Sequence, residues 1–343
     1  MLSRRLMVLV LWFASPGFVS ARDKTDVVHF TNGDRIHCEI KSLRRGKLTV
    51  KSIGFGTISI EWDKIAHIES DHVFRLELQS GIHYVGSLGP GTEDGKLEIE
   101  TASGTNRLDR ARIVNIDAVN RSFFEAIDGS VDIGYDFTQA AEATSWSLGA
   151  EAKYKKEKWE VGLNLDSLYK TQNDAEPVNR QDLRASYIRF LEGRWFAYGL
   201  GQAGKNANQS LSFRGQAGGG GGRRLVHTNR TNVSVLAGLG GVREKYTDTD
   251  FEASMEALAG FLFDSYRFNS PELQITTSLL FLPSLTQSNR YRIQFNSKVR
   301  MEIVKDLFWQ LALFETFDSN PPSEIAFANR NDFGLTTSFG WSF

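Results

Sequence analysis

The sequence contains very little cysteine and has no long hydrophobic run beyond its first residues. Cys38 is the only cysteine among 343 residues, so no disulfide bond can form within the chain. After Ala21 no apolar run reaches 18 residues, which argues against a membrane-spanning helix. If the protein lies in a membrane, it must be a closed β-barrel, because only helices and closed barrels satisfy every backbone group in lipid.

An excess of charge of one sign is also missing. The chain has 40 Lys and Arg against 41 Asp and Glu, so we expect no nucleic-acid partner and no bulk attraction to anionic lipid. The mean hydropathy of -0.30 leaves a membrane barrel open, because alternating apolar and polar residues cancel in an average.

Motifs of cofactor sites and of histidine-dependent catalysis are missing as well. The run Gly215–Gly222 lacks the GK[ST] ending of a phosphate loop, so a bend or close packing on a strand is the better interpretation. Residues 129–343 contain one histidine, His227, which we expect in a tight turn. Barrel hydrolases rely on histidine as general base, so we predict no enzyme activity and no cofactor.

Two sets of residues could still carry chemistry. Asp132, Asp136, Glu160 and Asp166 could act as paired acids, although acids in a barrel wall more often form salt bridges across the lumen. The remaining histidines all precede residue 120, at His29, His37, His67, His72 and His83. No pair has the close spacing of a zinc site with cysteine or carboxylate support, so we predict no metal site.

The first 21 residues have the pattern of an export signal. Arg4 and Arg5 precede the apolar run Leu6–Ala14, and small residues at Val19–Ala21 form a cleavage site. The run is much shorter than the roughly 20 residues that span a bilayer as a helix. Cys38 lies well beyond the cleavage site, so a lipid-anchored N-terminus is not expected.

Residues 22–120 contain a duplicated pattern, with copies at about 27–70 and 74–118. Three blocks recur in order: Asn32-Gly33 and Ser80-Gly81, Gly46-Lys47-Leu48 and Gly95-Lys96-Leu97, and Ile65–Ile68 and Ile113–Ile116. Short alternating stretches between Gly, Asn and Asp turns indicate antiparallel strands. We predict a periplasmic all-β domain of two small SH3-like or barrel-like modules.

Residues 129–343 alternate apolar and polar side chains over segments of ten or more residues. In Tyr291–Met301, for example, Ile293 and Phe295 share one face while Gln294 and Asn296 share the other. This pattern predicts an antiparallel transmembrane β-barrel of about twelve strands. They are expected near 129–139, 142–154, 157–171, 179–190, 193–205, 208–224, 228–240, 250–266, 271–283, 288–302, 306–317 and 330–343.

The connections and the end of the chain support the same prediction. Tight turns follow the even strands, as expected on the periplasmic side, and longer loops are expected at Gln172–Asn179, Val242–Asp250 and Ser319–Asn329. The first and fifth connections are short, which departs from this rule. Phe339, Trp341 and Phe343 share one face of the last strand, which resembles the C-terminal assembly signal of outer-membrane barrels.

The second part of the chain resembles the DUF481 family of outer-membrane proteins. The resemblance covers residues 129–343 and rests on the overall pattern, on Asp132–Phe137 and on Phe339–Phe343. It implies an outer-membrane barrel, with outer-membrane lipid and the barrel assembly machinery as partners. That family has no established activity, and the N-terminal domain is an addition to its minimal barrel.

Charged residues are expected to face the barrel interior, which would then carry both signs. They are Asp132, Asp136, Glu151, Asp166, Arg184, Arg214, Glu252, Glu256, Arg292, Lys298 and Arg300. Two functions remain open: a non-enzymatic barrel that anchors the N-terminal domain, where it binds a periplasmic partner, and a small-solute channel. The basic row Arg292, Lys298 and Arg300 would give such a channel a weak preference for anions.

Overall fold

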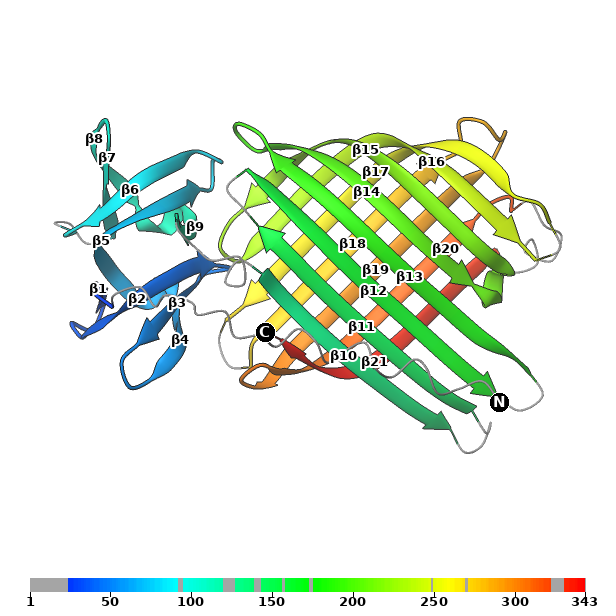
Figure 1. Cartoon of the computed structure of the whole chain (residues 1–343), viewed down its shortest axis with the longest axis horizontal. Coiled ribbons are helices and arrows are strands. Elements are labelled where there is room, and N and C mark those ends of the chain that lie inside the picture. The colour runs from blue at the N-terminus through cyan, green and yellow to red at the C-terminus, as the bar shows by residue number, and fades with distance from the viewer. Residues whose placement is uncertain are drawn as a thin grey trace, which may run out of the picture.

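The computed structural model consists almost wholly of β-strands, arranged as a small N-terminal sheet and a large closed barrel (Figure 1). It describes residues 24–91, 95–119, 127–138, 143–155, 158–172, 175–247, 249–268, 271–321 and 330–342. The predicted signal peptide, residues 1–21, lies outside these ranges. Within them, no helix has the length and apolar character needed to cross a membrane.

The N-terminal part is one sheet of nine strands. Its strands are β1 (Asp26–Phe30), β2 (Arg35–Arg44), β3 (Lys47–Ser52), β4 (Gly56–Glu61), β5 (Ile65–Leu78), β6 (His83–Gly89), β7 (Lys96–Thr101), β8 (Gly104–Asp109) and β9 (Ile113–Ala118), with short 3₁₀ turns η1 (Trp62–Lys64) and η2 (Arg110–Arg112). β1 and β9 each pair with both β2 and β5, so these four strands form a small closed barrel.

The order of elements in this sheet repeats. Four strands and a 3₁₀ turn precede a closing strand in each set. The first set is β1–β4, η1 and β5, and the second is β5–β8, η2 and β9, so the long β5 closes the first set and opens the second. The two sets share one apolar core, which includes Ile40, Val50, Leu76 and Ile99. The prediction of two small modules is therefore confirmed only in part, because the repeat is present but both sets share one core and close into one small barrel.

The second part is a closed antiparallel barrel of twelve strands, as predicted. Its strands are β10 (Ile127–Thr138), β11 (Ala143–Lys155), β12 (Trp159–Gln172), β13 (Ala175–Phe190), β14 (Trp195–Asn206), β15 (Leu211–His227), β16 (Thr231–Tyr246), β17 (Glu252–Arg267), β18 (Leu273–Pro283), β19 (Tyr291–Val304), β20 (Leu307–Asp318) and β21 (Asn331–Ser342), with the turn η5 (Ala207–Gln209) between β14 and β15. β10 pairs with β21, for example Val131 with Trp341, and this pairing closes the barrel.

One predicted loop is almost entirely strand. The polar segment Gln172–Asn179 was expected to connect two strands, but β12 continues to Gln172 and β13 begins at Ala175. Tyr169 pairs with Asn179 and Lys170 with Val178, so the ladder extends through the polar residues. Cross-strand backbone hydrogen bonds do not require apolar side chains, and hydrophobic patterning therefore placed the start of β13 too late.

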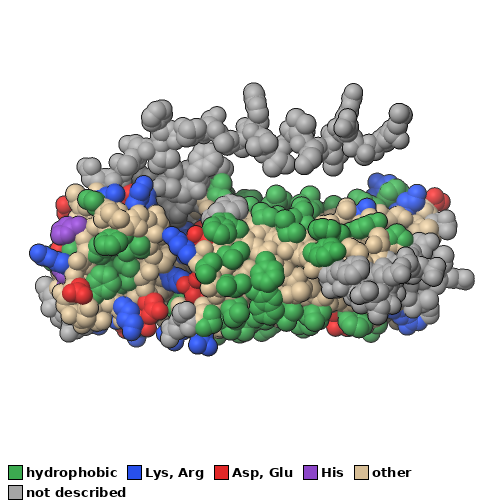
Figure 2. All heavy atoms as spheres, turned by 90° about the horizontal axis from the view of Figure 1, so that it is seen from below, with side chains coloured by type: hydrophobic (Ala, Val, Ile, Leu, Met, Phe, Trp, Pro, Cys, Tyr) green, Lys and Arg blue, Asp and Glu red, His purple; other side chains and the backbone are tan. Residues whose placement is uncertain are grey.

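The barrel is apolar on the outside and polar inside. Figure 2 shows hydrophobic side chains spread over the visible barrel wall, while charges gather at its two ends. Ile133, Leu163, Leu335 and Phe339 are each about half exposed or more on that wall. Arg292, one position from the exposed Tyr291, has no exposed surface at all. This arrangement is that of an outer-membrane barrel, whose outer wall faces lipid.

Candidate functional site

The N-terminal sheet packs against the end of the barrel where the short turns lie (Figure 1). Asn229, in the β15–β16 turn, donates to the carbonyl oxygen of Ile113 at 2.7 Å. Arg194, in the β13–β14 turn, donates through Nε to the carbonyl oxygen of Gln79 at 2.9 Å. Lys47 forms an ion pair with Glu272 from the β17–β18 connection. The contacts therefore come from three successive short turns at this mouth of the barrel.

Glu77, on β5, is buried at the centre of this contact. Its Oε1 lies 2.9 Å from the Arg224 guanidinium and 3.2 Å from His227 Nε2, both near the end of β15. The second carboxylate oxygen accepts a hydrogen bond of 2.6 Å from Asn115. Burial by itself raises the pKa of Glu77, but the His227 hydrogen bond and the charges of Lys155, Arg224 and His227 outweigh it. The pKa therefore lies well below its ordinary value.

A chamber of about 550 Å³ lies between the N-terminal sheet and the barrel interior. Its walls come from both parts of the chain and carry both signs of charge. Arg45 and Lys47 line it from the sheet, and Glu151, Arg300 and Tyr266 line it from the barrel. Such a space suits water, ions and small polar solutes with charges of both signs.

A buried ion-pair cluster lies at the opposite end of the barrel. Arg290 binds Glu244 and also Asp318, the latter at 2.6 Å. Arg214 lies 2.8 Å from Glu244, and its guanidinium donates to the Tyr246 hydroxyl at 2.9 Å. All five residues are at most 7% exposed. Each charge therefore has a partner of opposite sign, which buried ions require.

Charged pairs continue from this cluster along the interior. Arg292 binds the carboxylate of Glu256 through two nitrogens, at 2.8 and 2.5 Å, and also donates to Gln216. Further along, Arg184 and Lys298 lie 3.4 and 3.1 Å from Asp166. Two members of the predicted basic row, Arg292 and Lys298, are therefore neutralised by carboxylates. The predicted preference for anions stays a prediction, with less unpaired positive charge to support it.

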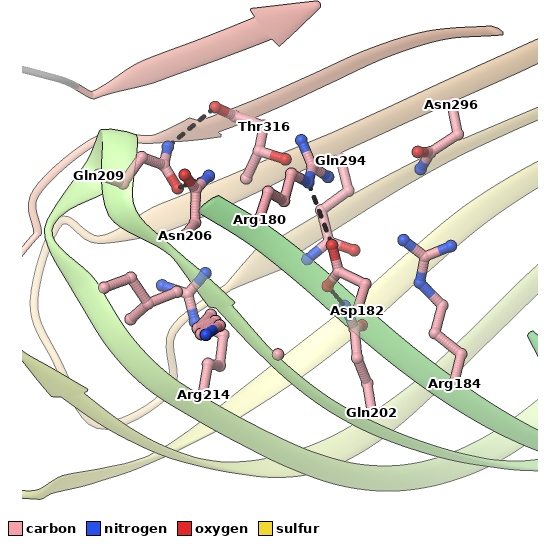
Figure 3. Close-up of a pocket in the computed structure, with 13 residues that line it drawn as sticks. Arg180, Asp182, Arg184, Gln202, Asn206, Gln209, Arg214, Gln294, Asn296 and Thr316 are labelled. Atoms are coloured by element: carbon pink, nitrogen blue, oxygen red, sulfur yellow. Dashed lines mark hydrogen bonds and ion pairs between the residues drawn. The ribbon is translucent and has the colours of Figure 1, made fainter. Parts of the chain in front are cut away.

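A polar network lies beside the cluster (Figure 3). There Arg180 donates to Asp182 at 3.1 Å, and Gln202 donates to the same carboxylate at 2.8 Å. Gln209, on the η5 turn, reaches across the interior to the carbonyl oxygen of Thr316 at 3.2 Å. The free space among these residues is only about 30 Å³. The pocket that these residues line is therefore small.

The remaining predicted interior charges lie nearer the chamber or at the opposite rim. Asp132 accepts a hydrogen bond of 3.0 Å from Ser338, and Glu151 pairs with Lys153. Arg300 donates to Gln310 at 3.1 Å and stacks on Phe308. Glu252 accepts from Gln287 at 3.1 Å. The side chain of Asp136 lies outside the part of the chain that the structure describes.

The predicted assembly signal lies on the outer wall of β21. Phe339 and Trp341 are more than half exposed there, and Phe343 falls outside the described residues. The glycine-rich run forms the middle of β15. A Cβ atom at Gly218 would lie 2.6 Å from the carbonyl oxygen of Leu239, which is closer than side chains allow. This strand therefore requires glycine at Gly218 for close packing.

Sequence reasoning missed several members of the buried cluster. Arg290 lies one residue before β19, and Asp318 is the last residue of β20. Hydrophobic alternation gives no clear signal at such strand ends. The face on which they lie could still be predicted from the sequence. Arg290 is an even number of residues from Arg292, and Asp318 is an even number from Gln310, so each shares the inward face of its neighbour. Extending the inward face past the strand ends would have found both.

Three residues of the N-terminal sheet come together in a way that the sequence did not predict. His29 on β1 pairs directly with His67 on β5, and their rings stack with centroids 4.0 Å apart. Glu69 lies two positions after His67, on the same face. Potential ligand atoms of the three lie within 4.8 Å of one another. Sequence spacing gave no sign of this pair, because strand pairing joins residues that are distant in sequence.

Comparisons with solved structures returned outer-membrane barrels. One is the translocator domain of the autotransporter NalP from Neisseria meningitidis, with 14% identity and a TM-score of 0.36, covering 63% of this chain and 87% of that one. Another is the NanC porin, with 10% identity, a TM-score of 0.37 and coverage of 63% and 98%. The KdgM porin has 13% identity, a TM-score of 0.34 and coverage of 63% and 99%.

No curated protein matched the sequence. A family model did match, over residues 131–343, and its description is "Protein of unknown function, DUF481". The match covers the barrel from the first residues of β10 to the end of the chain. The chain therefore belongs to the DUF481 family.

Proposed function

We propose that this protein is a non-enzymatic outer-membrane barrel that anchors its own N-terminal domain over the periplasmic mouth of the barrel. The observation that carries the proposal is the burial of Glu77 between Arg224 and His227. A charge removed from water in this way requires fixed partners. The domain is therefore held on the barrel mouth by a specific contact.

The periplasmic side follows from barrel architecture. In bacterial barrels, the termini and the short turns face the periplasm. In this chain β10 begins, β21 ends and the short turns lie at the mouth that contacts the N-terminal sheet. The predicted export signal is consistent with this orientation. The surface of the domain that faces away from the barrel is then free to bind a periplasmic partner.

Cysteine labelling tests the orientation. Ser103 lies in the exposed β7–β8 turn of the domain, and Ser288 lies in the exposed β18–β19 connection at the opposite end of the barrel. We expect Ser288→Cys to react with a membrane-impermeant maleimide in intact cells. Ser103→Cys should react only after the outer membrane is permeabilised. The unaltered chain is the control, because its only cysteine, Cys38, is fully buried.

The reverse pattern, with Ser103→Cys labelled in intact cells, would overturn the proposed orientation. Labelling of both variants in intact cells would overturn it as well. Labelling of neither variant after permeabilisation would contradict the exposure of the two turns.

A small-solute channel is the second candidate, and the chamber of about 550 Å³ favours it. The chamber is lined in part by the polar interior of the barrel, and the buried cluster around Arg290 lies at the far end. A conducting path would have to pass this cluster. Planar-bilayer recordings of the full chain distinguish the two candidates, since an anchor is expected to be silent and a channel to give discrete steps.

Glu77→Gln provides a matched variant for the recordings. If the domain closes a channel, this change should weaken the contact with Arg224 and increase the open fraction. Glu100→Gln, on the exposed side of β7, is the control and should behave as the unaltered chain. A refolded barrel that is silent in all three forms would exclude the channel.

A further inference from the structure

The histidine pair of the N-terminal sheet is held in place by backbone pairing. His29 and His67 lie directly opposite each other on the antiparallel strands β1 and β5, and Glu69 lies opposite Val27. Residues two apart on a strand point to the same face, so all three side chains project from one side of the sheet. Their separation is fixed by the hydrogen-bonded ladder and does not depend on a loop.

The donor atoms have the spacing of a tetrahedral metal site. His29 Nε2 lies 3.2 Å from Glu69 Oε1, and His67 Nε2 lies 3.3 Å from the same oxygen. Zinc bonds to imidazole nitrogen and carboxylate oxygen are about 2.0–2.1 Å long, which places tetrahedral ligands about 3.3 Å apart. The distances from the two nitrogens to the carboxylate oxygen therefore match a tetrahedral site, and one of the two stacked rings must turn to direct its lone pair at a shared ion.

The cluster also offers a buried ring nitrogen as a ligand. The Nε2 atom of His29 is buried and faces Glu69 Oε1, although the ring as a whole is only partly buried. A neutral imidazole presents a lone pair, and this is the form that binds metal.

We propose that His29, His67 and Glu69 form a binding site for one divalent transition-metal ion, with Zn²⁺ as the preferred ion. Two imidazoles and one carboxylate suit zinc and its neighbours better than calcium or magnesium, which prefer oxygen ligands. Three protein ligands leave a fourth position open. The side chains are 24–36% exposed, so water or a donor from another molecule can reach that position.

The site lies away from the barrel contact. His67 and Glu69 lie near the start of β5, and the docking residue Glu77 lies near its end. A bound ion would join β1 to β5 and stabilise the small closed barrel of the domain. The site goes beyond the anchoring function, because docking through Glu77 requires no metal.

Zinc titration of the refolded full chain, prepared without a histidine tag, tests the proposal. We expect one Zn²⁺ bound per chain in calorimetry, with affinity at least tenfold weaker in His29→Ala, His67→Ala and Glu69→Gln. Co²⁺ in place of Zn²⁺ should give the visible absorption of a tetrahedral site, which the three variants lose. His37→Ala is the matched control, because His37 lies on the neighbouring β2 and outside the cluster.

Absence of zinc binding by the unaltered chain would overturn the proposal. Equal loss of binding in His37→Ala would overturn it as well, because it would show binding by surface histidines in general. Glu69→Gln keeps the result interpretable if a histidine variant misfolds, since Glu69 is partly exposed and the amide preserves its shape. The labelling pattern at Ser103 and Ser288 is independent of this outcome, so the two proposals can fail separately.

Discussion

The N-terminal sheet and the barrel use the same alternation of side chains for opposite purposes. In β3 the apolar Leu48 and Val50 are fully buried, and the alternating polar residues face outward. In β19 the charged Arg292 is fully buried, and the apolar Tyr291 faces outward. A two-residue period of apolar and polar side chains therefore defines the two faces of a strand. Whether the apolar or the polar face is buried depends on whether the outer surface meets water or lipid.

The largest expected effect tests whether the buried charges of the barrel act as its core. Arg292→Met removes one partner of a fully buried ion pair and leaves Glu256 uncompensated, which should cost about 3–5 kcal/mol of unfolding free energy. The double variant Arg292→Met, Glu256→Gln should recover most of this loss. Urea unfolding in lipid vesicles measures both. If Arg292→Met alone is as stable as the unaltered chain, the buried charges do not act as the core of the barrel.

A smaller effect should distinguish two residues that have the same geometric exposure. Leu163 on β12 is 49% exposed and Val85 on β6 is 47% exposed, but only Leu163 faces lipid. Leu163→Arg should destabilise the barrel by roughly 2–4 kcal/mol, as arginine does near the bilayer midplane. Val85→Arg should change stability by less than about 0.5 kcal/mol, as surface changes usually do. The same unfolding assay compares them, and equal effects would contradict a lipid-facing wall.

The smallest expected effect appears only in acid and concerns the contact between the two regions. The docked state lowers the pKa of Glu77 below its ordinary value of 4.5, because Arg224, His227 and Lys155 favour the carboxylate. Docking should therefore be complete above that value and weaken as the pH falls through the lowered pKa.

Spin labels at Ser103→Cys and Ser288→Cys measure this docking as a distance distribution. The distribution should stay narrow at pH 5 and broaden at lower pH. Glu77→Gln should show no such pH dependence over the same range, because it has no carboxyl group to protonate there. A wild-type distribution that is unchanged down to pH 2 would contradict the role of Glu77.

The sequence by itself determined the all-β class, the twelve barrel strands and the faces of those strands. These features depend on local alternation, which a chain carries without reference to its partners. The same alternation also predicted that Arg292 and Lys298 face the barrel interior. Strand ends were less certain, as at Gln172, because polar residues also continue a ladder.

Only the tertiary structure decided which residues meet. Glu77 reaches Arg224 and His227 across the contact of two regions, Arg290 meets Asp318 from different strands, and His29 meets His67 through strand register. Alternation specifies the face of a residue but not its neighbour on the next strand. Register and docking arise from the sum of many long-range contacts, and no single stretch of sequence contains them.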